Sequence, residues 1–336
     1  MKTLSSLILM SLLVTTSVWA KLPYVPIEFP RADAAHFEDS TTLTEWWYFN
    51  GKLTSTNGRK FAYYIIYSYF QTKIFGSVIK APCFVLQITD LDNKKVYGQK
   101  NLLLPIQRLD KNNLDIMFGK NITLQNVDGT YLIEALATTK SKDRLRVSLQ
   151  LTPSRSVLLN GENGYRDGWG DSSMYYYSQP HLLTAGSIEV GSEQFNINPQ
   201  TSLSWMNRQW TDCAMRDKST QWQWANAQLD NGIDLDLWQI YNPKTQAYSD
   251  HAINILLPDG RKFYSENITY TARDHPSDKY PQVYDLFVPE INLRLTFTAS
   301  APNQDVAGFW EGMSDVAGIY NSVSVRGHGY TENTLR

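Results

Sequence analysis

The sequence predicts an all-β protein built of two tandem antiparallel β-barrels. Two observations carry this prediction: short aromatic and β-branched segments recur between turn residues, and several motifs occur twice in the same order. The chain has 336 residues, of which 13% are aromatic, with 10 Trp, 20 Tyr and 13 Phe. Strands and apolar pockets are both rich in such side chains. Almost no segment has the 3.6-residue period of an amphipathic helix.

The N-terminal residues 1–20 are predicted to be a secretory signal peptide rather than part of the fold. Lys2 precedes an apolar run over residues 4–14, and residues 18–20 form a small-x-small cleavage pattern before Lys21. An uncleaved anchor helix is the alternative, but the apolar run is short for a bilayer span. We therefore expect an exported protein, periplasmic or secreted, with no stable membrane span after signal cleavage.

The rest of the chain alternates between strand-like segments and turns. The segment 61–70 is almost entirely aromatic and β-branched and carries no helix-capping pattern. Similar segments cover residues 84–89, 122–124, 131–135, 145–151, 233–241, 252–257, 284–288 and 293–298. Hairpin-type turn residues lie at 55–58, 128–129, 230–232 and 258–260. Short strands at this spacing are typical of a sandwich or barrel.

Four motif pairs occur in the same order in the two halves of the chain. Residues 45–53 align with 221–229, 84–97 with 252–264, 177–186 with 309–318, and 210–212 with 330–332. The first half also carries an insertion roughly within residues 98–175. Such an internal repeat indicates two related structural units. We expect an N-terminal barrel over residues 21–212 and a C-terminal barrel over residues 213–336.

The aromatic starts of the two repeats have two possible roles. Trp46 and Trp222 can close the bottom of a small barrel, or they can contact a ligand. Successive side chains of a strand point to opposite faces, so some of Trp47, Tyr48 and Trp224 must point away from their own barrel. If the barrels pack together, those outward aromatics can line a cavity at the domain interface, which is a favoured place for ligand sites.

Charge and motif searches exclude several function classes. The 31 Lys and Arg are balanced by 33 Asp and Glu, so the chain lacks the basic excess of a nucleic-acid binder. Five His occur at positions 36, 181, 251, 275 and 328 without a paired metal-ligand spacing, and we expect no metal. No complete nucleotide-binding fingerprint is present, and we expect no cofactor. The segment 312–316 begins like a nucleophile elbow but lacks its second Gly. Cys83 and Cys213 either form a disulfide or remain separate thiols.

Five motifs resemble those of a known family. They are His36-Phe37 with Glu45-Trp-Trp-Tyr-Phe-Asn-Gly51, Tyr175-Tyr-Tyr-Ser-Gln-Pro180, Ser204-Trp-Met-Asn-Arg-Gln-Trp210, Phe309-Trp-Glu-Gly312 and Gly327-His-Gly-Tyr-Thr-Glu332. The set is similar to that of the AttH-like family, which includes the carotenoid 1,2-hydratases (CrtC) and is usually labelled as secreted hydrolases. The resemblance implies a tandem lipocalin-like fold with a hydrophobic pocket at or near the domain interface. It leaves the reaction open, because the family's chemistries are diverse.

Two positions depart from the family pattern. The family usually has Asp where this chain has Asn207 and Glu where it has Gln209. Protonation of an alkene needs a positioned acid, and an amide cannot supply the proton. If the missing Asp is a proton donor in relatives, this chain has lost that donor or moved it. If the Asp is structural, the change is mild.

Glu311 is the best remaining candidate for an acid, because its apolar neighbours favour a raised pKa. Its alternative role is an ion pair with Arg208 or Arg326. His36 and His328 are further candidates for catalysis, and His181 also lies in a family motif. Each can act as a base or orient a ligand, or be purely structural.

The predicted ligand is a hydrophobic small molecule, such as a lipid, a terpenoid or a polyketide-like compound. The predicted pocket residues are motif aromatics from both repeats, together with two polar neighbours: Trp47, Tyr48, Tyr176, Trp205, Asn207, Arg208, Trp210 and Trp310. Binding is the first functional hypothesis. The second is an enzyme acting on the same ligand, either a hydratase, isomerase or cyclase that uses a buried acid, or a hydrolase.

Overall fold

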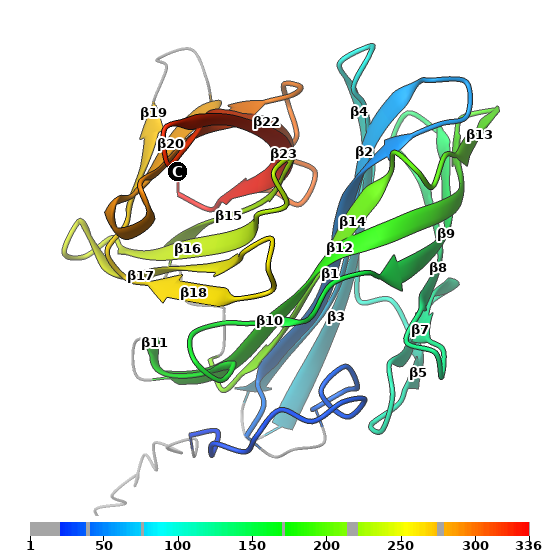
Figure 1. Ribbon diagram of the computed structural model, residues 1–336. Coiled ribbons are helices and arrows are strands. Elements are labelled where there is room, and N and C mark those ends of the chain that lie inside the picture. The colour runs from blue at the N-terminus through cyan, green and yellow to red at the C-terminus, as the bar shows by residue number, and fades with distance from the viewer. Residues whose placement is uncertain are drawn as a thin grey trace, which may run out of the picture.

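The computed structural model describes residues 21–37, 41–74, 77–169, 172–213, 221–273 and 279–335. Within these residues the chain forms two curled antiparallel sheets, which confirms the prediction of an all-β fold with two repeated barrel-like units (Figure 1). The predicted signal peptide lies outside the described residues.

The first sheet has fourteen strands and takes up the chain from Thr44 to Thr211. Its strands are β1 (Thr44–Thr54), β2 (Lys60–Ile74), β3 (Ser77–Asp90), β4 (Lys95–Leu102), β5 (Ile106–Leu109), β6 (Asp115–Phe118), β7 (Asn121–Gln125), β8 (Tyr131–Thr138), β9 (Arg144–Pro153), β10 (Leu158–Leu159), β11 (Tyr165–Trp169), β12 (Ser172–Val190), β13 (Glu193–Ile197) and β14 (Leu203–Thr211). Their order is β4-β3-β2-β1-β14-β12-β9-β8-β7-β6-β5, with β10, β11 and β13 beside β12.

The second sheet has nine strands and begins at Gln221. Its strands are β15 (Gln221–Leu229), β16 (Asp234–Asn242), β17 (Ala247–Leu256), β18 (Lys262–Ser265), β19 (Thr269–Arg273), β20 (Val283–Val288), β21 (Leu293–Ala299), β22 (Trp310–Tyr320) and β23 (Val323–Asn333), with one 3₁₀ turn at Pro289–Ile291. The order β18-β17-β16-β15-β23-β22-β21-β20-β19 matches the part of the first sheet from β4 to β7, which continues with β6 and β5. In both sheets the first strand lies between the second strand and the last, as expected of a repeat.

The sheets bury side chains on both faces of their central strands. Trp47 and Phe49 of β1 belong to the core inside the first sheet, whereas Tyr48 between them belongs to a third apolar cluster shared with the second sheet. A separate core lies inside the second sheet and includes Leu235 and Phe297. The alternation of a strand therefore decides whether a residue packs within its own sheet or faces the other sheet.

The segment between β9 and β12 connects the two sheets with polar contacts. The Arg155 guanidinium donates to the Gly232 carbonyl at 2.5 Å and to Asp234 Oδ2 at 2.6 Å. Further along, the Gly161 amide donates to Asn254 Oδ1 at 2.8 Å. These partners belong to the turn before β16 and to β16 and β17. Part of the predicted insertion thus fixes the second sheet against the first.

Two further observations concern the part of the chain that the structure describes. None of its helices has both the length and the apolar character needed to cross a membrane. Cys83 and Cys213, whose pairing the sequence left open, are not joined by a disulfide.

Candidate functional site

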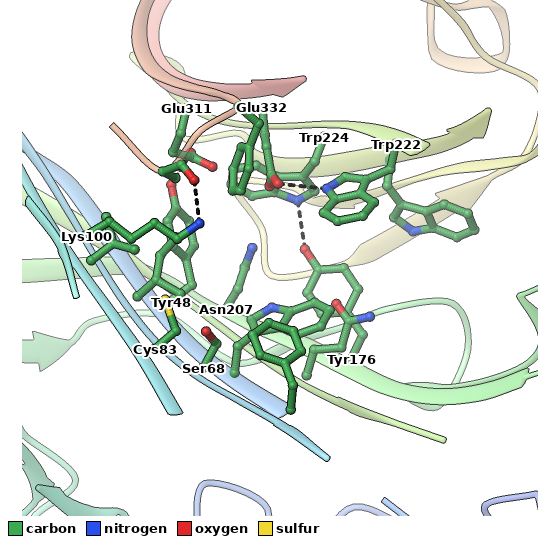
Figure 2. A pocket seen from close by; sticks show the side chains of 18 of the residues that line it. Tyr48, Ser68, Cys83, Lys100, Tyr176, Asn207, Trp222, Trp224, Glu311 and Glu332 are labelled. Atoms are coloured by element: carbon green, nitrogen blue, oxygen red, sulfur yellow. Dashed lines mark hydrogen bonds between the residues drawn. The ribbon is translucent and has the colours of Figure 1, made fainter. Parts of the chain in front are cut away.

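A cavity of about 310 Å³ lies between the two sheets. Its walls are largely aromatic: Trp46 comes from β1, Trp222 and Trp224 from β15, and Trp238 from β16. Figure 2 shows Trp222 and Trp224 opposite Tyr48 and Tyr176 of the first sheet. Trp46 and Trp222 therefore face the shared cavity rather than closing the bottom of a barrel. The volume falls at the lower end of the range usual for small-molecule sites.

Two carboxyl groups meet at one wall of this cavity. Glu311 on β22 is the direct cross-strand partner of Glu332 on β23, so the two buried carboxyl groups lie next to each other in the cavity lining. The Tyr48 hydroxyl donates to Glu311 Oε1 at 2.5 Å, and Trp222 Nε1 donates to Glu332 Oε1 at 2.7 Å. Both carboxyl groups are labelled at the upper wall in Figure 2.

The pair is arranged to retain a proton. Burial raises the pKa of Glu332 to about 7. Burial, together with the adjacent charge of Glu332, raises the pKa of Glu311 well above its usual range. Because two adjacent carboxylates repel, the pair keeps a shared proton at neutral pH, with Glu311 as its main holder. Tyr48 and Trp222 each offer a hydrogen bond that stabilises the anion left after proton release.

No positive side chain neutralises this pair among the residues that the structure describes. Lys100 lines the cavity, but its Nζ donates to the Ala307 carbonyl at 2.7 Å. Arg208, one of the two arginines proposed as a partner for Glu311, instead pairs with Glu45. The other, Arg326, is exposed. Glu311 thus remains an uncompensated acid in an apolar wall.

A third buried acid lies behind the opposite wall. Burial raises the pKa of Asp236 to about 6, and Tyr176 is among its hydrogen-bond partners. The Tyr176 hydroxyl also accepts from Trp224 Nε1 at 2.8 Å, as Figure 2 shows. Asp236 is itself not part of the cavity lining, so we assign it the positioning of Tyr176 and Trp224.

Four of the residues predicted from the sequence line the cavity together: Tyr48, Tyr176, Asn207 and Glu311. They come from β1, β12, β14 and β22. The side chain of Asn207 points into the cavity (Figure 2). Its Oδ1 accepts from Trp205 Nε1 at 2.6 Å and from Ser178 Oγ at 2.7 Å. Gln209 lines the cavity on the same strand.

Four other predicted site residues lie in the core of the first sheet instead. The Arg208 side chain is fully buried, is ion-paired to Glu45 and lies 4.2 Å from the ring centroid of Trp47. The His36 ring stacks on Trp210 with centroids 3.9 Å apart, and its backbone amide donates to Glu45 Oε1 at 2.9 Å. None of these residues is part of the cavity lining. Trp47, Arg208 and Trp210 occupy strand positions that point away from the second sheet, and His36 lies in the segment before β1.

The remaining predicted residues, Trp205, Trp310 and His328, are also outside the cavity lining. Trp205 packs with Leu158 and Leu256 and supports Asn207 from behind. Trp310 precedes the cavity-facing Glu311 on β22, and its Nε1 donates to Thr331 Oγ1 at 3.0 Å. Burial lowers the pKa of His328 to about 3, so its ring is neutral at physiological pH.

Several cavity residues were missed by the sequence-based assignment. Glu332 is the most important, although it belongs to a motif quoted above and to the last repeat pair. The sequence did contain a signal for it: Phe309–Gly312 lies at the start of β22 and Gly327–Glu332 at the end of β23, and these two strands pair antiparallel. Cys83 and Lys100 carried no motif signal at all. In the described residues no group of three or more His, Cys, Asp or Glu could hold a metal ion.

Comparisons with known proteins find similarity in sequence and in fold. A family model described as AttH-like matches residues 20–334. Kievitone hydratase of Fusarium solani subsp. phaseoli is 21% identical over 324 residues, which cover 92% of this chain and 86% of that protein.

Two solved structures share the fold. An AttH protein of Nitrosomonas europaea has 23% identity and a TM-score of 0.77, covering 94% of this chain and 99% of that one. Kievitone hydratase of Nectria haematococca has 16% identity and a TM-score of 0.71, covering 92% of each chain. At these identities the structural likeness concerns the fold alone.

Proposed function

From the premise that this chain belongs to the AttH-like family, we propose that it is a hydratase-type enzyme. It binds a largely apolar small molecule in the cavity between the sheets and adds water across a carbon–carbon double bond, or removes water in the reverse direction. The observation that carries the proposal is the proton-holding pair of Glu311 and Glu332, which lies in an aromatic wall and has no ion-pair partner among the residues that the structure describes.

The pair can supply and recover the proton that the reaction needs. The Glu311 carboxyl transfers its proton to one alkene carbon, and the π electrons form the new C–H bond. A water oxygen then attacks the carbocation, and one of its protons returns to the carboxylate pair. The reaction is balanced, with one water consumed and the acid regenerated. Tyr48 and Trp222 stabilise the carboxylates during the cationic stage.

The aromatic walls suit the cationic intermediate. The faces of Trp and Tyr rings attract positive charge, and the attraction is stronger where water is excluded. Trp46, Trp222, Trp224 and Trp238 supply such rings from both sheets. The same walls bind an apolar skeleton through the hydrophobic effect.

The acid pair favours an enzyme over a passive carrier. A carrier of apolar molecules gains nothing from two uncompensated buried carboxyl groups, which cost free energy to bury. A hydrolase is supported less well. Cys83 and Ser68 line the cavity, but burial raises the pKa of the Cys83 thiol, and none of the His residues that the structure describes is part of the lining. Nucleophilic catalysis usually needs an activating base beside the nucleophile.

Export is part of the proposal. The signal-like residues 1–20 support a periplasmic or secreted location. The test is to express the intact chain and a chain without residues 1–20 and to compare in which cell fraction each protein is found.

The test of function uses the purified protein with kievitone, on which the similar fungal enzyme is named to act. The incubation is run in ¹⁸O-labelled water beside a panel of alkene-bearing terpenoids, and products are followed by mass spectrometry. We expect a product carrying one ¹⁸O from at least one compound and none from Glu311→Gln. An absence of labelled product from every compound, with the cavity shown to bind them, would contradict hydratase activity.

A further inference from the structure

Asn207 presents an unused hydrogen-bond donor to the cavity. The residue is 5% exposed and lies on β14, in the lining between the two sheets. Both known contacts of its amide go to Oδ1, from Trp205 and Ser178. Among the described residues nothing accepts a hydrogen bond from its Nδ2, which points into the open centre in Figure 2.

The orientation of this amide is fixed by its neighbours. An indole Nε1–H can only donate, so the Asn207 atom that faces Trp205 must be the oxygen. The nitrogen therefore faces the cavity in every arrangement that keeps this bond. An amide donor held in this way at the cavity surface can pair with water, and a ligand that displaces the water has to supply an acceptor in its place.

Gln209 offers a complementary group two residues further along the same strand. It is also 5% exposed and lines the cavity. Its Nε2 contacts Met174 Sδ at 3.1 Å, which leaves Oε1 without a donor among the residues described. Residues two apart on a strand share a face and are separated by roughly 6–7 Å. The wall thus presents a donor and an acceptor from neighbouring positions on one face of the strand.

This polar edge lies next to the acid pair. Asn207 is the cross-strand partner of Tyr48, and the Tyr48 hydroxyl bonds to Glu311. Trp46 is the cross-strand partner of Gln209. A ligand oxygen bound at Asn207 would therefore lie one strand away from the tyrosine that holds the acid, while the rest of the ligand contacts indole rings.

We infer that the substrate is an oxygenated apolar molecule: a carbonyl-type oxygen accepts from Asn207 Nδ2, and a hydroxyl roughly 6–7 Å away donates to Gln209 Oε1. The inference rests on the proposed function and specifies its substrate class. It excludes a pure hydrocarbon, which would leave both amides desolvated and unpaired. Asn207 and Gln209 thereby select the substrate and set its distance from Glu311.

The test measures binding with probes that cannot be hydrated. The probes are 1,3-diphenylpropane, 1,3-diphenylpropan-1-one and the 4′-hydroxy derivative of that ketone, which share one skeleton and differ only in oxygen content. Affinity is followed by quenching of the cavity tryptophans. We expect each oxygen to improve the dissociation constant of the wild-type protein about tenfold. Equal affinity for all three probes would overturn the inference.

Two variants assign the effects to the two amides. Asn207→Asp keeps the Oδ1 that Trp205 and Ser178 require but can donate only when protonated. Its preference for the ketone should be present at acidic pH and disappear as pH rises, whereas the wild-type preference stays constant. Gln209→Leu should lose only the gain from the 4′-hydroxyl. A pH-independent preference in Asn207→Asp, or an undiminished hydroxyl gain in Gln209→Leu, would contradict the assignments.

The same measurements separate this inference from the proposed function. Glu311→Gln should keep the preference for oxygenated probes, because binding does not use the proton. Hydration of a substrate by a wild-type protein that shows no such preference would overturn the inference and leave the hydratase proposal standing. A clear preference without any ¹⁸O incorporation would support the inference and contradict hydratase activity.

Discussion

Glu45 and Glu311 are both buried glutamates, but different groups face their carboxyl groups. In the core of the first sheet, Glu45 contacts the buried Arg208 guanidinium and the His36 amide. Burial raises the pKa of Glu45 to about 7, and Arg208 opposes that rise. At the cavity, Glu311 faces a second carboxyl group, Glu332, which adds to the rise.

The difference separates a structural acid from a chemical one. An arginine that fully pairs a carboxylate fixes its position and keeps it out of proton transfer. A second carboxyl group in an apolar wall does the opposite, because it makes one proton hard to remove until a reacting group accepts it. Glu45 accordingly lies away from the cavity, and Glu311 is part of its lining.

The largest contrast is expected from the same substitution at the two sites. Glu311→Gln should lower kcat by about 10²–10⁴-fold with little change in substrate affinity, because it removes the proton donor but keeps the shape. Glu45→Gln should leave kcat near the wild-type value. Steady-state kinetics on the substrate identified by ¹⁸O labelling measures both. Equal losses of kcat in the two variants would contradict the assignment of Glu311 as the proton donor and of Glu45 as a structural acid.

The reverse contrast is expected in stability. Arg208→Met leaves Glu45 buried without its partner, which should lower the free energy of unfolding by about 3–5 kcal/mol. Urea denaturation followed by fluorescence measures the change. The double variant Glu45→Gln with Arg208→Met is the control and should recover part of the loss. A destabilisation below about 1 kcal/mol would show that the ion pair does not hold the core.

The pair should also shape the pH dependence of stability. The pKa of Glu332 is raised by burial from 4.5 to about 7, so the folded protein binds more protons than the unfolded chain across this range. Its contribution to stability is therefore complete below pH 4.5 and is lost as pH rises towards 7. Glu332→Gln should flatten this decline by up to about 1.4 kcal/mol per pH unit. Thermal or urea unfolding from pH 4.5 to 8 measures the slope, and unchanged slopes would contradict a raised pKa.

The smallest effect is expected from the hydrogen bond that supports Glu332. Trp222→Phe removes the Nε1 donor that stabilises the Glu332 anion. Because the anion loses this stabilisation, the pKa of Glu332 rises, and the alkaline limb of the pH–rate profile should move to higher pH by about one unit. Trp238→Phe is the matched control, because the Trp238 indole also lines the cavity but donates to Asn160. A shift of the same size in both variants would indicate a general effect of the wall rather than this bond.

The fold was predictable from the sequence because its signals are local and repeated. Aromatic segments such as 61–70 have few alternatives to a strand, and the aligned motifs at 45–53 and 221–229 mark equivalent first strands. Each of these segments forms the first strand of its sheet in chain order, and in the sheet this strand lies between the second strand and the last. The family resemblance rested on motifs that lie between residues 36 and 332.

The site was predictable only in part, because both faces of the central strands are apolar. Trp47 and Tyr48 are neighbours in one motif, yet one enters the core of the first sheet and the other faces the cavity. An alternating polar pattern would have distinguished the faces, and β1 has none. The same ambiguity placed Arg208 and Trp210 beside Asn207 in the predicted site. The pairing of Glu311 with Glu332 depends on strand register, which the sequence does not state directly.

The most direct test of the central claim is an infrared difference spectrum of wild-type protein against Glu311→Gln at pH 7. The account predicts the carbonyl stretch of a protonated carboxylic acid in the wild-type protein and its loss in the variant. A difference spectrum that contains only ionised carboxylate bands would contradict the claim that Glu311 holds a proton in the cavity.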